Sequence, residues 1–127
     1  VGWGTVFFDF DRDGDEDTFV SNGHVIRYPT SAPLRQKPLL MQNIDGKRFV
    51  NVAAAAGAYL TTDHMGRGVA VGDIDNDGDL DLMADGILFR NSGNSNNWLK
   101  VKLTGDPSRG IAASFKRAAK RSSAGTD

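Results

Sequence analysis

Asp73-Ile74-Asp75-Asn76-Asp77-Gly78-Asp79-Leu80-Asp81 has an earlier counterpart in Asp9-Phe10-Asp11-Arg12-Asp13-Gly14-Asp15-Glu16-Asp17. Both stretches place aspartate at positions 1, 3, 5, 7 and 9 and glycine at position 6. Alternating carboxylate oxygens and a glycine that permits a sharp turn are what Ca²⁺ needs from a short loop. Mg²⁺ fits such a flexible loop less well, because it requires a strict octahedron. The pattern therefore predicts two calcium sites.

Solvated Asp-Gly turns are the alternative interpretation, because both residues are common in turns for local reasons. Five carboxylates in one short loop repel each other, however, and each close pair costs about 1 kcal/mol even in water. A bound cation explains why the arrangement occurs twice. We expect side-chain ligands from positions 1, 3, 5 and 9, and the backbone carbonyl from position 7. The candidate metal residues are Asp9, Asp11, Asp13, Asp15, Asp17, Asp73, Asp75, Asp77, Asp79 and Asp81.

The residues around the two loops are typical of strands. An EF-hand requires glutamate at position 12 and a helix on each side, but position 12 is Val20 in one loop and Ala84 in the other. The flanking apolar runs have the length of strands of about 4–6 residues. We therefore expect each loop to join two antiparallel strands. The same observation disfavours an intracellular helical calcium sensor.

The two loops belong to an internal repeat. The offset that aligns Asp9 with Asp73 also aligns Gly2 with Gly66 and Gly4 with Gly68. The offset is 64 residues (73 − 9). A repeat of this length without long helices indicates propeller-type blades of four antiparallel strands. We expect strands at residues 4–8, 18–21, 39–43 and 48–52 in the first unit, and at 68–72, 81–84 and 87–90 in the second. Residues 53–56 suggest one helical turn that ends at Gly57, and a further strand is expected at 98–103.

Charge is distributed unevenly along the chain. The formal net charge is −1, but eleven of the sixteen acidic residues lie in the two loops, so the remainder is basic. There is no cysteine, and no apolar run reaches the 18 or so residues that a transmembrane helix requires. Any targeting signal would have to precede Val1.

Residues 68–73, followed by the second acidic loop, resemble an FG-GAP or VCBS repeat, the calcium-loop blade of integrin α-subunit propellers and many bacterial secreted proteins. Three further segments, 21–25, 64–68 and 97–103, resemble the cartilage acidic protein family, in which such blades run into an ASPIC/UnbV-type module. The resemblance implies an extracellular or envelope-associated calcium-binding propeller used for adhesion or ligand recognition.

This resemblance divides the chain into four parts. Residues 1–57 form a first FG-GAP-type blade, 58–95 a second, partial blade, and 96–111 the start of an ASPIC/UnbV-like segment. Residues 112–127 are expected to be a basic, flexible tail, with a basic helix as the alternative. Because a ring needs at least about four blades, the chain is expected to be an all-β fragment, a partial β-propeller that forms part of a larger one.

The predicted function is that of a calcium-binding β-propeller repeat module for extracellular adhesion or ligand recognition. It would be secreted or associated with the cell envelope, with a protein or glycan as ligand and no nucleic acid. The connection at residues 22–37 is the candidate partner surface, since long loops are often functional. Two alternatives stay open: a calcium-dependent, lectin-like sugar-binding propeller, and a non-catalytic accessory repeat of a larger secreted enzyme.

No enzymatic activity is expected from the sequence. It contains neither Gly-x-Ser-x-Gly nor a phosphate-binding glycine loop. His24 and His64 are expected to make structural hydrogen bonds. Trp3, Tyr28 and Trp98 could stack on a sugar, but burial is the favoured expectation for both tryptophans.

Overall fold

The computed structural model describes residues 1–28, 30–96, 98–105 and 113–120. The chain divides into two compact units, Val1–Gly93 and Asn94–Asp127. Among the described residues the only helix is α1 (Ala58–Thr61), and no helix there is long and apolar enough to cross a membrane. The expectation of an all-β chain is confirmed.

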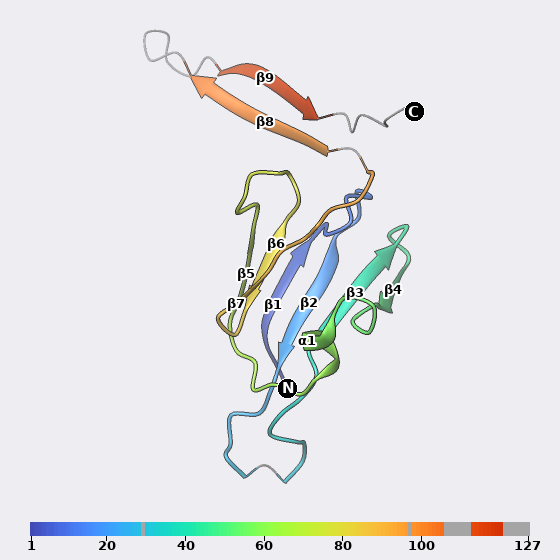
Figure 1. The fold of residues 1–127 in the computed structure, drawn as a ribbon, viewed down its shortest axis with the longest axis vertical. Coiled ribbons are helices and arrows are strands. Elements are labelled where there is room, and N and C mark those ends of the chain that lie inside the picture. Colours follow the sequence, from blue (N-terminus) through green and yellow to red (C-terminus); the bar gives the residue numbers. More distant parts are fainter. Residues whose placement is uncertain (29, 97, 106–112, 121–127) are drawn as a thin grey trace. The chain divides into compact units, whose positions relative to one another are not determined.

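Two antiparallel sheets make up the first unit (Figure 1). The first sheet has the order β1-β2-β3-β4, and its strands are β1 (Gly2–Phe8), β2 (Asp17–Asn22), β3 (Leu39–Ile44) and β4 (Arg48–Asn51). The second has the order β5-β6-β7, and its strands are β5 (Val69–Gly72), β6 (Asp81–Ala84) and β7 (Ile87–Phe89). All seven strands lie within two residues of their predicted bounds. The described residues of this unit form two sheets and no closed ring.

The register of the two sheets follows the sequence repeat. Phe7 pairs with Thr18 in the first sheet, and their counterparts in the repeat, Val71 and Leu82, pair in the second. The third strands follow a shorter offset, because Thr18 pairs with Met41 whereas Leu82 pairs with Phe89. The difference arises between the second and third strands. Residues 23–38 connect β2 to β3, whereas a two-residue turn connects β6 to β7.

That tight turn consists of Asp85 and Gly86, which have φ angles of 53° and 77°. Positive φ at both central residues is the geometry of a two-residue hairpin turn, and Asp-Gly suits it. The second sheet therefore turns back directly where the first sheet carries its long connection. The first acidic loop lies at one end of the first sheet, and the long connection lies at the other end (Figure 1).

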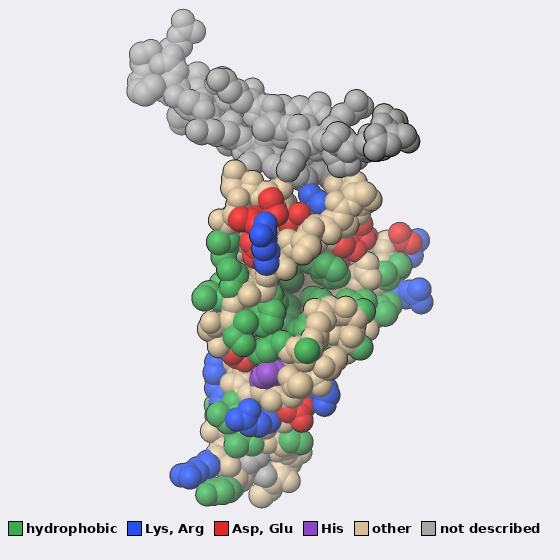
Figure 2. All heavy atoms as spheres, viewed as in Figure 1, with side chains coloured by type: hydrophobic (Ala, Val, Ile, Leu, Met, Phe, Trp, Pro, Cys, Tyr) green, Lys and Arg blue, Asp and Glu red, His purple; other side chains and the backbone are tan. Residues whose placement is uncertain are grey.

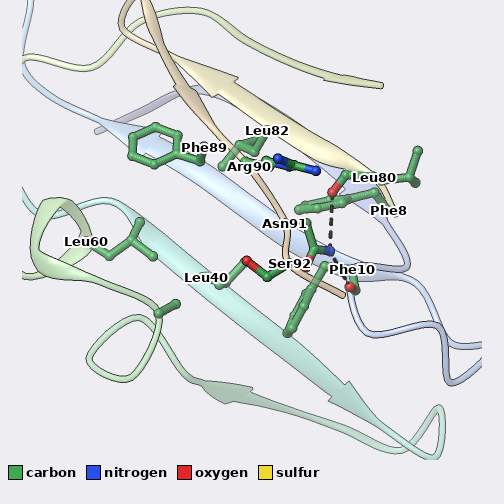
Figure 3. A pocket seen from close by; sticks show the side chains of 11 residues that line it. Phe8, Phe10, Leu40, Leu60, Leu80, Leu82, Phe89, Arg90, Asn91 and Ser92 are labelled. Atoms are coloured by element: carbon green, nitrogen blue, oxygen red, sulfur yellow. Dashed lines mark hydrogen bonds between the residues drawn. The ribbon is translucent and has the colours of Figure 1, made fainter. Parts of the chain in front are cut away.

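The core of the first unit lies between the two sheets. Phe8, Phe19 and Leu40 point from the first sheet towards Leu82 and Ala84 of the second, and all five side chains are buried. Leu60 of α1 joins the same cluster. An apolar pocket of about 270 Å³ remains between the sheets, and Figure 3 shows the side chains that line it.

Glycines allow the backbones of the two sheets to meet. A Cβ added to Gly4 in β1 would lie 2.5 Å from the carbonyl oxygen of Arg67, and one added to Gly66 would overlap Ser21 Oγ. The Gly66 N–H donates to the carbonyl of Asn22 at 2.9 Å. Any larger residue at these two positions would separate the sheets.

Two local expectations differ from the structure. Residues 53–56 form hydrogen-bonded turns, and the helix begins after Gly57, whose φ of 127° interrupts a continuous helix. Trp3 is 46% exposed, because it lies on the face of β1 that points away from the second sheet. Its Nε1 donates to the Gly23 carbonyl, and the Arg67 guanidinium lies over its ring. The Trp98 side chain lies outside the described residues.

The described residues of the second unit form an antiparallel pair of strands, β8 (Trp98–Gly105) and β9 (Ala113–Lys120). Trp98 pairs with Lys120 and Gly105 with Ala113. The strand β9 replaces the flexible tail or basic helix expected over these residues. An uninterrupted pairing partner explains the difference, because backbone hydrogen bonds to β8 outweigh the weak strand propensity of an alanine- and lysine-rich segment. The rest of the expected tail, residues 121–127, lies outside the described residues.

Candidate metal centre

Both acidic stretches form loops between antiparallel strands, as predicted: the first joins β1 to β2 and the second joins β5 to β6. Their backbones share two left-handed residues. Position 4 has φ of 58° at Arg12 and 61° at Asn76, and position 6 has φ of 97° at Gly14 and 93° at Gly78. Side chains rarely adopt the wider angle, so glycine is required at position 6. The two copies of the repeat therefore adopt the same loop conformation.

Carboxylates converge within each loop. In the first, one oxygen from each of Asp9, Asp11 and Asp17 lies within 4.8 Å of the others. Two oxygens that both bind Ca²⁺ at its usual distance are at most about 5 Å apart, so this spacing suits a shared ion. In the second loop the corresponding group is Asp73, Asp75 and Asp77.

The two groups share the aspartates at positions 1 and 3 but differ in the third member. The first uses position 9, whereas the second uses position 5. Asp13, at position 5 of the first loop, is exposed, and its Oδ1 accepts the Asp15 N–H. Four predicted residues therefore lie outside the two converging groups; they are Asp13, Asp15, Asp79 and Asp81.

In each loop the side chain of the aspartate at position 9 accepts hydrogen bonds from backbone N–H groups of other residues. Asp17 is fully buried and Asp81 is 2% exposed. In both, Oδ2 accepts the position-2 N–H at 3.1 Å, from Phe10 or Ile74. The Oδ1 atoms accept N–H groups from a residue of β3 and from the second residue beyond β7. Asn43 donates to Asp17 at 2.8 Å, and Asn91 donates to Asp81 at 2.9 Å. A buried carboxylate thus ties each loop to its sheet.

Residues near the ends of β3 and β7 also contact the loops. The Gln42 Nε2 atom donates to Asp11 Oδ2 at 2.6 Å. Its counterpart in the second sheet, Arg90, contacts the Asp75 carboxylate and lies 3.8 Å from that of Asp77. The first site therefore has a neutral amide where the second has a cation. The repeat in the sequence does not reveal this pair, because the long connection before β3 shifts its offset.

The two loops lie next to each other and are joined by polar contacts. Arg12 Nε is 2.8 Å from Asp79 Oδ1, and both side chains are almost completely buried. Asn91 Nδ2 donates to the carbonyl of Phe10 at 2.7 Å, as the dashed lines in Figure 3 show. On the face shown in Figure 2, acidic side chains gather at one end of the described surface, with basic side chains among them.

Asp79, the aspartate at position 7 of the second loop, forms an ion pair with Arg12. A Cβ on Gly93 would overlap Asp79 Oδ2, so the chain after β7 closes over this carboxylate. The Asp79 carboxylate thus pairs with the first loop and is not one of the three that converge in its own loop. The expectation that position 7 offers its backbone carbonyl to a cation stays a prediction.

Burial raises the pKa values of two loop carboxylates. For Asp17 burial is the main cause, while the N–H donors of Asn43 and Phe10 act in the opposite direction. For Asp79 burial is again the main cause; Arg12 opposes it, and the other carboxylates of the second loop add to it. A divalent cation would favour the ionised forms, because positive charge nearby lowers a carboxyl pKa.

The candidate ligand atoms of both loops are all oxygens, and several of them are charged. Such a set of donors suits a hard cation such as Ca²⁺. The residues of both loops therefore fit calcium. The candidate ligands that the structure brings together are Asp9, Asp11 and Asp17 in one loop and Asp73, Asp75 and Asp77 in the other.

Both histidines have structural hydrogen bonds. His24 is 9% exposed, and its Nδ1 accepts the Ile26 N–H at 3.1 Å. The His64 ring stacks on Tyr59 with centroids 3.8 Å apart, and its Nε2 lies 2.8 Å from Thr62 Oγ1. The expectation for both residues is confirmed.

Comparisons with protein-family models, curated proteins and solved structures found no match for this chain. The resemblance to FG-GAP repeats and to the cartilage acidic protein family stays a prediction.

Proposed function

We propose that this chain is a calcium-binding repeat module, in which each sheet is a blade of a β-propeller and each Asp-rich loop holds one Ca²⁺. The observation that carries the proposal is the equivalence of the two loops. They share their left-handed backbone positions, their strand connections and a cluster of three converging carboxylates. One acidic turn would carry little weight, but the same construction in two places favours a common ligand.

The role of the cation would be structural. Each loop joins the first two strands of its sheet, and its position-9 aspartate accepts a backbone N–H from the third strand or from just beyond it. An ion bound to the carboxylates would relieve their mutual repulsion and hold the strands in register. A ligand that binds only the folded state raises its stability, by about 2.7 kcal/mol at a concentration of one hundred times Kd.

Calorimetric and thermal titrations test the proposal. The full chain, freed of metal with a chelator, should bind two Ca²⁺ ions, and its Tm should rise with calcium concentration. Mg²⁺ should produce a much smaller rise, because it holds its waters and demands an octahedron. An unchanged Tm over the whole calcium range, with no heat of binding, would reduce the loops to ordinary turns.

We propose that the protein is secreted or envelope-associated. We also propose that the connection between β2 and β3 recognises its ligand. Val25, Ile26 and Tyr28 are exposed there, by 57, 58 and 78%. Exposed apolar side chains on a loop, away from the calcium loop of the same sheet, favour a protein or glycan partner. A screen of extracellular proteins and glycans, with wild type and Tyr28→Ser, tests this role. Binding that is unchanged in the variant would move the ligand surface elsewhere.

A further inference from the structure

Each sheet of the first unit has two faces, because side chains alternate along a strand. One face of the first sheet, with Phe8, Phe19 and Leu40, packs against the second sheet. The opposite face is called the outer face of the first sheet; it consists of Trp3, Thr5, Phe7, Thr18, Val20, Leu39, Met41 and Phe49, together with the polar residues Asn22, Asn43 and Asn51. The outer face of the second sheet consists of Ala70, Met83 and Leu88.

Both outer faces carry large apolar side chains that are exposed within the described part of the first unit. Phe7 is 60% exposed and Phe49 is 49% exposed. Phe7 and Phe49 line an apolar hollow of about 300 Å³ together with Thr18 and Met41. On the second sheet, Met83 and Leu88 are 46 and 47% exposed. Large apolar side chains gathered on one face are typical of interaction surfaces.

The internal repeat shows what these two faces fit. Leu82 and Ala84 are buried against the first sheet, and their counterparts in the repeat, Thr18 and Val20, lie on the outer face of the first sheet. Conversely, Phe19 is buried against the second sheet, whereas its counterpart Met83 lies on the second outer face. The two sheets therefore stack head to tail. The outer face of the first sheet corresponds to the inner face of the second sheet, and the outer face of the second sheet corresponds to the inner face of the first. The two outer faces could therefore pack against each other in the same way as the two inner faces do.

Polar contacts of the internal interface have counterparts at the outer faces. Asn91 donates to the carbonyl of Phe10 across the internal interface. Asn43 is the counterpart of Asn91, and Ile74 is the counterpart of Phe10. A second copy stacked in the same manner would bring its Asn43 amide to the Ile74 carbonyl. Asparagine stands in place of Arg12 at position 76, so the buried ion pair would not be repeated and the contact between copies would be weaker than the internal one.

We infer that a second copy of this chain docks on these faces, with the outer face of the first sheet of one copy against the outer face of the second sheet of the next. Such a contact joins different surfaces, so it is heterologous and leads either to a closed ring or to an open filament. Each added copy would contribute two more sheets to the stack.

Complementary charge variants test this assembly. Phe7→Asp disables the first outer face and Met83→Asp disables the second. Analytical ultracentrifugation over a range of concentrations, in buffer with calcium, should give wild-type masses above the monomer. Each variant alone should be a monomer. An equal mixture should form a 1:1 dimer, because one partner keeps the first face intact and the other keeps the second.

Tyr28→Asp is the matched control, because it adds the same charge at an exposed aromatic residue outside both faces, and it should assemble like wild type. Circular dichroism and Tm check that the variants fold, and Phe49→Asp with Leu88→Asp provides a second complementary pair. A wild-type monomer at every concentration would overturn the inference. So would a single variant that still dimerises, since that shows contact between like faces, or a mixture that stays monomeric.

Discussion

The guanidinium of Arg12, in the first acidic loop, lies 2.8 Å from the carboxylate of Asp79 in the second. The side chains are 11 and 8% exposed, so the pair is largely removed from water. Arg12 occupies the left-handed position 4 of its loop, with φ of 58°. The loop conformation and the contact between the sheets are thus linked through one residue.

Replacing Arg12 should destabilise the protein strongly. Arg12→Gln leaves the Asp79 charge buried among the other carboxylates of its loop, and the loss of one partner from a buried pair costs about 3–5 kcal/mol. Asp79→Asn in the same chain should recover part of this loss. Urea unfolding of the two single variants and the double variant measures the coupling.

Lys37→Gln serves as the control for that cycle. Lys37 pairs with Asp63 at 3.0 Å, but both side chains are more than half exposed. An exposed pair contributes at most about 1 kcal/mol. Equal losses for Arg12→Gln and Lys37→Gln would contradict a buried link between the loops.

Asp75→Asn should reduce the stabilisation by calcium and leave the chelated protein nearly unchanged. It removes a charge from the second carboxylate group, and the ion pair that it breaks is with Arg90, whose side chain is 69% exposed. Its effect without metal should therefore be within about 1 kcal/mol. Thermal denaturation with calcium and with chelator measures both effects.

Asp45→Asn makes the same chemical change in an Asp-Gly turn that belongs to neither cluster. Its φ of 54° is one that asparagine tolerates. We expect no difference between calcium and chelator beyond that of wild type. If Asp75→Asn behaves in the same way, the second loop does not bind calcium through this carboxylate.

Asp81→Asn should destabilise the protein even in chelator. Both oxygens of the Asp81 carboxylate accept backbone N–H groups, from Ile74 and Asn91, in a site that is 2% exposed. The amide would turn one acceptor into a donor facing another donor. Hydrogen bonds to charged groups contribute about 1.5–3 kcal/mol, so a loss of that size is expected. Urea unfolding in chelator gives the answer, and a loss no larger than that of Asp75→Asn would contradict it.

Arg90→Gln should tighten calcium binding at the second loop. It installs the residue type that Gln42 supplies at the first site, and it removes a cation from beside Asp75 and Asp77. Removing one partly solvated charge should favour a divalent ion by about 1 kcal/mol, or roughly fivefold in Kd. Isothermal titration calorimetry resolves the change. Arg48→Gln, on β4, should leave both sites unaltered, and an unchanged second site in Arg90→Gln would show that Arg90 does not compete with the cation.

Local pattern was enough to predict the strands and the hairpin loops of this protein. The alternation of apolar residues and the turn chemistry of Asp-Gly depend on near neighbours, so all seven strands of the first unit could be predicted to within two residues. The left-handed glycines Gly14 and Gly78 follow from the same spacing in both loops. The convergence of positions 1 and 3 in each loop was predictable for the same reason.

Contacts between distant strands were decided by the tertiary structure. Gln42 and Arg90 occupy the same place beside their loops, but the longer connection between β2 and β3 conceals the correspondence in the sequence. Arg12 and Asp79 meet only because the sheets stack, and Trp3 is exposed because it lies on the face of β1 away from that stack. Hydrogen bonding and steric preference within a few residues determine a strand or a turn. Which side chains complete a site depends on how separate sheets pack against each other. A local sequence pattern holds no information about that packing.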